Sequence, residues 1–167
     1  PGPPPFPVAT APPPPLTPAV SAHMLKIARR ADDSEEAAAA VAETALRGTD
    51  GWDGCEKNSA AEARRIVDAV RFINANFASP CTLDALADVA SMSRFRFARR
   101  FRAVTGETAN QYVLNRRLSA AAARLAATRT PVLEIAYDVG FNDLSYFYAR
   151  FKAAFGCAPG AWRGAQR

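Results

Sequence analysis

The stretch IAYDVGFNDLSYFYARFKAAFG, from Ile135 to Gly156, combines closely spaced aromatic residues with a glycine and a short polar cluster in its middle. Glycine tolerates a positive φ, and Asp143 is of a residue type that caps helix N-termini. Aromatic residues recur every three or four positions after Asp143, as on the buried face of a helix. The stretch therefore predicts two short helices joined by a tight turn, a helix-turn-helix, with its second helix over about residues 143–155.

A weaker copy of this stretch, LADVASMSRFRFARRFRAVTG, occupies residues 86–106. The aligned pairs are Ala87 with Ala136 at an offset of 49, and Phe97 with Phe147, Phe101 with Phe151 and Gly106 with Gly156 at an offset of 50. The difference of one residue falls in the turn, so the second turn is one residue longer. The sequence thus contains two helix-turn-helix motifs, over about 82–105 and 131–156, and the first recognition helix covers about 93–105. Ser91 replaces the turn glycine in the first copy, where it is less suited to a positive φ.

Capping signals place the remaining helices. Ser59 and Glu62 have the spacing of a capping box, and the helix that they open has one apolar face, formed by Ile66, Val70, Ile73 and Phe77. Thr108 and Gln111 form a second capping box that opens a long helix between the two motifs. The prediction is an all-α domain of seven helices over residues 61–167, built from two helix-turn-helix subdomains joined by a long linker helix.

Residues 1–60 differ in composition from this domain. Ten of the first twenty residues are proline and none is charged, which predicts a disordered, proline-rich tail without the features of a signal peptide. An alanine-rich helix is expected over 34–47, followed by a polar loop over 48–59. We interpret residues 1–60 as a linker or as the remnant of an upstream domain.

Charge is distributed unevenly between these two parts. Residues 1–61 have a net charge of −3, whereas residues 62–167 have a net charge of +8 with 15 arginines. Arginine forks bind phosphates and guanine edges, so the basic part predicts a polyanionic partner. A solvated basic surface is the alternative interpretation of the charge alone.

The arginines concentrate on the outer face of the first recognition helix. Arg96, Arg99 and Arg100 are spaced i, i+3, i+4 and are expected to project together. The corresponding face of the second recognition helix has fewer groups that hydrogen-bond to bases. We therefore expect more base readout from the first motif, and more phosphate and thymine-methyl contacts from the second. The linker helix of about 20 residues is roughly 30 Å long, close to the ~34 Å between successive major grooves on one face of DNA.

The motifs together resemble the DNA-binding domain of the AraC/XylS-type transcription regulators. The resemblance covers about residues 62–165 and is strongest in EIAYDVGFNDLSYFYARFKAAFGCAPGAWR (134–163). It also includes QYVLNRRLSAAAARL (111–125), which fits the linker pattern of the family. The resemblance implies a bacterial, cytoplasmic regulator that binds asymmetric double-stranded DNA sites in promoters or operators through both motifs, near RNA polymerase.

The resemblance also implies which residues contact DNA. The expected base contacts are Phe95, Arg96, Arg99, Ser145, Tyr148 and Ala149, with Ala98 at a further position that reads bases in the family. The expected phosphate contacts are Arg94, Arg100, Arg102, Arg150 and Lys152. Ala149 departs from the family pattern, which often has arginine there, so the resemblance supports the base contacts of the second motif less strongly than those of the first.

Two other classes of protein are alternatives to this hypothesis. A helical protein-interaction module with only non-specific DNA affinity is the alternative, and it requires a dispensable arginine face. An enzyme, such as an alkyl acceptor, would need an activated cysteine, but the three cysteines and the single histidine are not arranged in any such pattern. We therefore predict no enzyme, catalytic residue, cofactor, metal or membrane association. Residues 1–60 could contact an upstream sensor domain or a dimer partner, and the sequence leaves both alternatives open.

Overall fold

The computed structural model describes residues 56–165, and the side chains from residue 61 onward. This part of the chain forms seven α-helices and no strand, which confirms the predicted all-α class. The helices are α3 (Glu56–Asn76), α4 (Leu83–Val89), α5 (Arg94–Thr105), α6 (Ala109–Ala127), α7 (Val132–Asp138), α8 (Leu144–Phe155) and α9 (Pro159–Ala165). The proline-rich tail and the alanine-rich helix over 34–47 lie outside the described residues. Among the helices described, none is long and apolar enough to cross a membrane.

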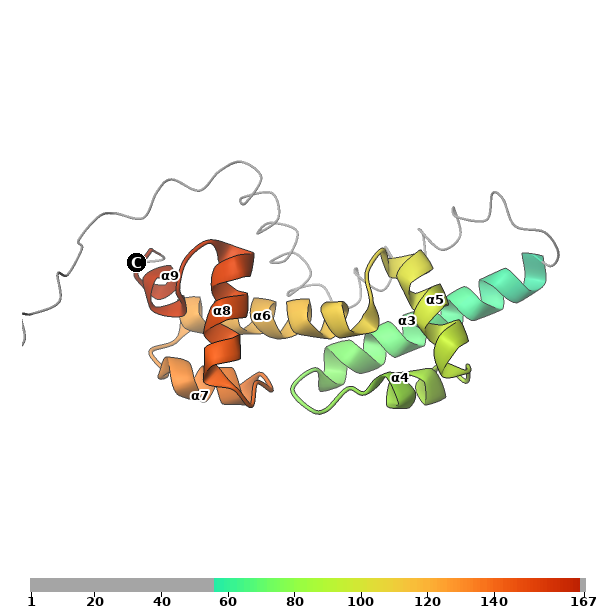
Figure 1. Ribbon diagram of the computed structural model, residues 1–167, viewed down its shortest axis with the longest axis horizontal. Coiled ribbons are helices and arrows are strands. Elements are labelled where there is room, and N and C mark those ends of the chain that lie inside the picture. Colours follow the sequence, from blue (N-terminus) through green and yellow to red (C-terminus); the bar gives the residue numbers. More distant parts are fainter. Residues whose placement is uncertain (1–55, 166–167) are drawn as a thin grey trace, which may run out of the picture.

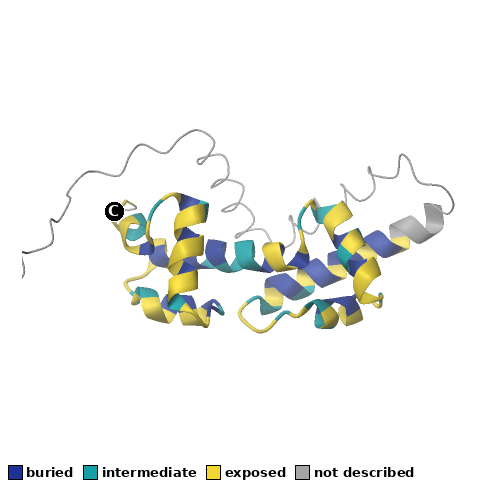
Figure 2. Ribbon diagram, viewed as in Figure 1, coloured by how far each residue is buried: buried dark blue, intermediate teal, exposed yellow. Residues whose placement is uncertain are grey.

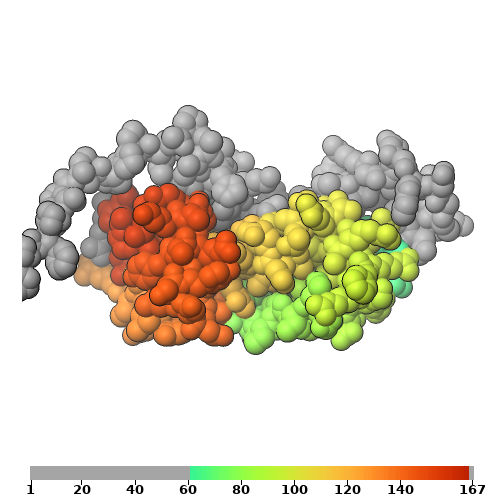
Figure 3. All heavy atoms as spheres, viewed as in Figure 1, coloured from blue at the N-terminus to red at the C-terminus, as the bar shows by residue number. Residues whose placement is uncertain are grey.

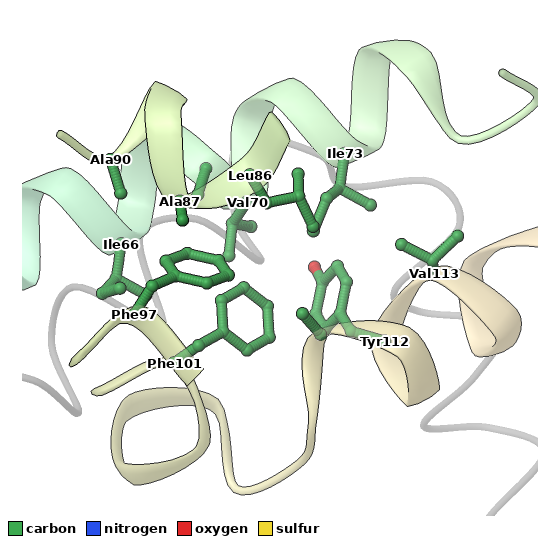
Figure 4. Packing of buried hydrophobic residues seen from close by; sticks show 12 residues of the cluster. Ile66, Val70, Ile73, Leu86, Ala87, Ala90, Phe97, Phe101, Tyr112 and Val113 are labelled. Carbon is green, nitrogen blue, oxygen red and sulfur yellow. The ribbon is translucent and has the colours of Figure 1, made fainter. Parts of the chain in front are cut away.

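The helices form two groups at opposite ends of α6 (Figure 1). One group contains α3, α4 and α5, and the other contains α7, α8 and α9. In the first group Phe97 and Phe101 of α5 are fully buried against aliphatic residues of α3 and α4 (Figure 4). Phe101 also meets the ring of Tyr112 edge-on, with the ring centroids 5.7 Å apart. Aromatic side chains therefore fix α5 on its subdomain by one face only.

The second group repeats this arrangement with a larger aromatic cluster. Phe147, Phe151 and Phe155 of α8 are buried in it, one helical turn apart. Trp162 of α9 packs on Phe155 at a centroid distance of 5.0 Å and donates a 3.2 Å hydrogen bond from Nε1 to the carbonyl of Ala122. The frequent aromatics of the sequence thus form the core that supports α8.

The linker helix α6 contributes to both cores. Its first turns supply Tyr112 and Val113 to the first core, and its later turns supply Leu118, Ala121 and Leu125 to the second. A helix of 19 residues is about 28 Å long. Because each end of α6 is buried in a different subdomain, this rigid helix sets the separation of the two groups.

The turns of the two motifs have the same hydrogen bonds. The Ser91 N–H donates to Asp88 O and the Met92 N–H to Ala87 O, and the equivalent amides of the second motif bond to Tyr137 O and Ala136 O. Ser91 has φ 50°, the one positive value at a non-glycine residue in the described part of the chain, whereas Gly140 has φ 92°. Asn142 is the extra residue of the second turn. The predicted repeat and its one-residue shift are thus confirmed.

Helix caps agree with the sequence in part. The side chains of Thr82, Thr108 and Asp143 each accept a hydrogen bond from the backbone N–H three residues later. Ser93 stands at the N-cap of α5 but makes no such bond. Pro131 is the N-cap of α7, and no side-chain cap hydrogen bond forms there.

The predicted start of the first helix was wrong. α3 begins at Glu56, so Ser59 and Glu62 lie inside it rather than at a capping box, and residues 56–59 are helix instead of loop. Its predicted end was wrong as well, because α3 stops at Asn76, and Phe77 packs against the core of the second subdomain. Phe77 follows Ile73 by four residues, as on a helix face, although the helix has already ended at Asn76. This spacing is why the sequence predicts too long a helix.

The segment after α3 links the two subdomains. Arg117 of α6 donates hydrogen bonds to the carbonyls of Phe77 (2.7 Å) and Ser79 (2.9 Å). The guanidinium of Arg116 lies 4.9 Å from the centroid of the Phe77 ring. A Cβ on Gly140 would be only 2.4 Å from the carbonyl oxygen of Ala78, so glycine is required there by space as well as by φ. These contacts restrict rotation of one subdomain relative to the other.

Candidate nucleic-acid interface

The outer face of α5 brings together three of the predicted base-contacting residues. Phe95 is 88% exposed, which is unusual for phenylalanine. Phe95, Arg96 and Arg99 line an open hollow of about 570 Å³ together with Ser93 at the helix N-terminus. An exposed ring beside two guanidinium groups combines an apolar contact for thymine methyls with donors for guanine edges.

Arg96 and Arg100 lie on the flank of α5 that faces α3. The guanidinium of Arg96 pairs with Oε1 of Glu62, and that of Arg100 pairs with Oε2 of the same carboxylate. Glu62 is buried, with a side chain 8% exposed, whereas the side chain of Arg96 remains 50% exposed. The sequence predicts that Arg96, Arg99 and Arg100 project as one set. In the structure Arg96 lines the hollow with Arg99 and also pairs with Glu62, whereas Arg100 pairs with Glu62 and does not line the hollow.

The other basic residues of α5 lie at its two ends. Arg94 Nη1 is 3.5 Å from both carboxylate oxygens of Asp84 on α4, in an exposed ion pair. Arg102 is exposed in the last turn. Both positions are suited to the phosphates that border a groove.

The outer face of α8 is less basic. Ser145, Tyr148 and Ala149 are all exposed, and Tyr148 is 40% exposed. Arg150 is exposed, and its guanidinium lies 5.0 Å from the centroid of the Tyr146 ring, in a cation–π contact. Lys152 is exposed as well. The structure therefore brings all the predicted residues of the second motif onto one solvent-facing helix.

The two recognition helices are presented on the same side of the molecule. In Figure 1, α8 passes in front of α6, and α5 passes in front of α3. Figure 2 shows that the face of α8 turned toward the viewer is almost entirely exposed. In the space-filling view, atoms of both helices form the visible surface at the two ends of the domain (Figure 3). One extended partner can therefore reach both helices at once.

Sequence reasoning missed Glu62 as part of this face. Its spacing from Ser59 predicts half of a capping box, but Glu62 also lies four residues before Ile66 and therefore on the apolar face of α3. An acidic residue on an apolar face is the signal that was available, because a buried carboxylate needs a cationic partner. The structure supplies that partner from the recognition helix.

The two cysteines in the described part of the chain are not activated as nucleophiles. Burial raises the pKa of the Cys81 thiol, an effect that Arg117 partly opposes, and burial also raises the pKa of Cys157. A nucleophilic cysteine needs the opposite shift. No group of His, Cys, Asp and Glu side chains in the described part of the chain is arranged to hold a metal ion.

Comparison with known sequences agrees with this geometry. A family described as a helix-turn-helix domain matches residues 86–165. The regulatory protein SoxS of Escherichia coli K12 is 32% identical over 98 residues, which are 59% of this chain and 92% of SoxS. The transcriptional activator RclR of the same organism is 40% identical over 82 residues, which are 49% of this chain but 29% of RclR. The chain thus spans nearly all of one relative and under a third of the other.

Solved structures show the same fold. An AraC-type DNA-binding regulator from Chromobacterium violaceum has a TM-score of 0.59 at 25% identity and is matched over 64% of this chain and 96% of its own. The DNA-binding domain of the transcriptional factor AdpA, solved in complex with a target DNA, has a TM-score of 0.59 at 29% identity, over 62% and 93% of the two chains.

The fold and its two exposed recognition helices define a double helix-turn-helix DNA-binding protein. The chain belongs to the AraC/XylS family of transcription regulators, as its sequence motifs indicated. The relatives described above are regulators rather than enzymes, which confirms the predicted absence of an enzymatic function.

Proposed function

We propose that this protein is a sequence-specific regulator of transcription that places α5 and α8 in successive major grooves of double-stranded DNA. The single observation that supports this proposal best is the exposed ring of Phe95 beside Arg96 and Arg99 on the outer face of α5. A merely electrostatic surface needs no exposed phenylalanine among its arginines. An exposed ring has a use where the partner presents apolar groups, as thymine does in the major groove.

Placement in two grooves is supported by the rigid connection between the motifs. The length of α6 is about 28 Å, and successive major grooves on one face of DNA are ~34 Å apart. Arg117 and Gly140 hold the segment after α3 against the second motif. Modest bending of the DNA would accommodate the remaining difference.

The base contacts are assigned to the residues that face outward on each helix. On α5 these are Phe95, Arg96 and Arg99, and on α8 they are Ser145, Tyr148 and Ala149. The phosphate contacts are assigned to the basic residues around them, which are Arg94, Arg100, Arg102, Arg150 and Lys152. The same proposal includes contact with RNA polymerase and action in the cytoplasm. It also includes contact of residues 1–60 with an upstream sensor domain or with a second copy of the chain.

The proposal is tested by selecting binding sites from a random-sequence duplex library with the full chain. We expect an asymmetric site with two parts, and we expect Arg99→Ala to reduce the preference at one base pair by about 1–3 kcal/mol. The matched control is Arg129→Ala, which removes the same charge from an exposed residue outside both recognition helices. It should weaken binding to all sequences equally, or leave it unchanged.

Enrichment of no site, together with an affinity that depends on salt but not on sequence, would contradict the proposal. The arginine face would then be a general electrostatic surface. The chain would be a helical interaction module with non-specific DNA affinity.

A further inference from the structure

Glu62 is a buried carboxylate that contacts the recognition helix from the neighbouring helix. It lies on α3, thirty-four residues before Arg96 in the chain, and its side chain is 8% exposed. Each of its two oxygens accepts from a different arginine, Oε1 from Arg96 and Oε2 from Arg100. A carboxylate removed from water in this way requires both partners, because an unpaired buried charge is strongly unfavourable.

The two arginines are one helical turn apart, so a single carboxylate reaches both. Guanidinium has five N–H donors in a planar fork, and the contact with Glu62 uses Nη2 of Arg96. Half of the Arg96 side chain remains exposed, and it lines the hollow with Phe95 and Arg99. Glu62 therefore binds one edge of the Arg96 guanidinium on the side of α3, while the rest of the Arg96 side chain lies at the proposed DNA-binding face.

An arginine held in this way is ordered before DNA arrives. A free arginine loses the freedom of several rotatable bonds when it binds a base, whereas a preorganised one loses less. A fixed orientation also admits fewer hydrogen-bond partners, and base selectivity depends on the orientation of the fork. The contact with Glu62 thus favours binding of Arg96 to one base edge. It disfavours binding to phosphates, which accept a guanidinium in many orientations.

The charge of Glu62 acts in the same direction. Non-specific affinity comes from cations that neutralise phosphates. A carboxylate placed between two arginines reduces their net attraction for any DNA, whatever its sequence. Glu62 should therefore lower non-specific binding while it raises the contribution of Arg96 to specific binding.

We propose that Glu62 is a positioning residue that sets the base selectivity of α5 by orienting Arg96 and Arg100. This inference rests on the proposed function, since it presupposes that the chain selects a DNA sequence. It adds to the interface a residue that does not touch DNA and lies outside the helix-turn-helix motif.

The test compares Glu62→Gln with wild type in the full chain, using the site selected by wild type, its single-base variants and a scrambled duplex. We expect Glu62→Gln to lose about tenfold of its preference at the base pair that Arg96→Met also affects. Its affinity for the scrambled duplex should rise. The double variant Glu62→Gln/Arg96→Met should lose no more preference than Arg96→Met alone, because the two residues act as one unit.

Two further variants separate geometry from charge and from folding. Asp68→Asn removes an exposed acidic charge from the same helix and should leave the base preference unchanged. Glu62→Asp keeps the charge but withdraws the carboxylate by one methylene. It should lose preference at the same base pair with little change on the scrambled duplex, and it decides the question if Glu62→Gln does not fold.

If folded Glu62→Gln and Glu62→Asp keep the base preference of wild type, even with a lower melting temperature, the inference is overturned. Glu62 would then only stabilise the fold. Additive losses in the double variant would overturn it as well. If wild type selects no site, the proposed function fails, and the inference fails with it. A site selected equally well by wild type and by the variants contradicts the inference alone.

Discussion

The two helix-turn-helix units of this protein share their buried residues but differ on their outer faces. Phe97 and Phe101 correspond to Phe147 and Phe151, and all four are fully buried. Outside, Phe95 and Arg99 of the first unit correspond to Ser145 and Ala149 of the second. The same buried residues thus hold both recognition helices in place, although the two helices expose different residues to solvent.

The flanks of the two recognition helices are also held differently. In the first unit Arg96 and Arg100 pair with the buried Glu62. The second unit has Tyr146 and Arg150 at these positions, in a cation–π contact on the helix surface. A salt bridge to a neighbouring helix restrains both arginines, whereas a stack on the same helix leaves Arg150 exposed. We infer that the first unit is built for selective readout and the second for broader contacts.

The largest expected effect concerns the turn of the second unit. Gly140→Ala should lower the free energy of unfolding by about 3 kcal/mol or more, because the backbone has φ 92° and the new Cβ would meet the Ala78 carbonyl at 2.4 Å. Urea denaturation measures this loss. Gly106→Ala is the matched control, with φ 79° and open space around its Cβ, so it should lose only about 1–2 kcal/mol. Equal losses in the two variants would contradict the close contact between the subdomains.

The difference in readout can be tested by giving the second unit the arginine of the first. Ala149→Arg places a guanidinium at the position equivalent to Arg99, and it should add about 1–3 kcal/mol of preference at one base pair in the second half of the site. Site selection before and after the change measures this gain. Ala161→Arg on α9 adds the same charge at an exposed position away from both recognition helices. If both variants bind all sequences more tightly without any new preference, α8 does not read bases at this position.

A smaller difference is expected at the helix caps. Asp143→Ala removes a 3.0 Å hydrogen bond from the Tyr146 N–H and should cost about 1 kcal/mol of stability. Ser93→Ala at the equivalent position should cost much less, because the Ser93 side chain makes no cap hydrogen bond. Thermal unfolding of the two variants measures both changes. A larger loss in Ser93→Ala would show that the caps contribute in the opposite order.

The sequence predicted the fold well because its signals were local. Aromatic spacing, N-cap residues and glycines fixed α4 to α8 to within a residue or two, and the repeat fixed the pairing of the two motifs. It failed where a residue acts across the molecule. Nothing near Phe77 in the chain shows that its ring packs into the second core, or that Arg117 binds the carbonyls beside it.

The candidate site was predicted in the same uneven way. Helical periodicity placed Arg99, Ser145 and Ala149 on outer faces, and the family resemblance added Phe95; all four are exposed in the structure. The partner of Arg96 could not be obtained from the spacing within α5, since Glu62 belongs to another helix. Which of these residues contact bases stays a prediction.

The central claim is that one chain holds two recognition helices at a fixed separation that matches successive major grooves. It is tested most directly by measuring affinity for the selected site after five base pairs are inserted between its halves. Half a helical turn moves the second groove to the opposite face of the DNA, so the account predicts that affinity falls to that of the first half-site alone. Unchanged affinity for the interrupted site would contradict it, because only one recognition helix would then engage the DNA.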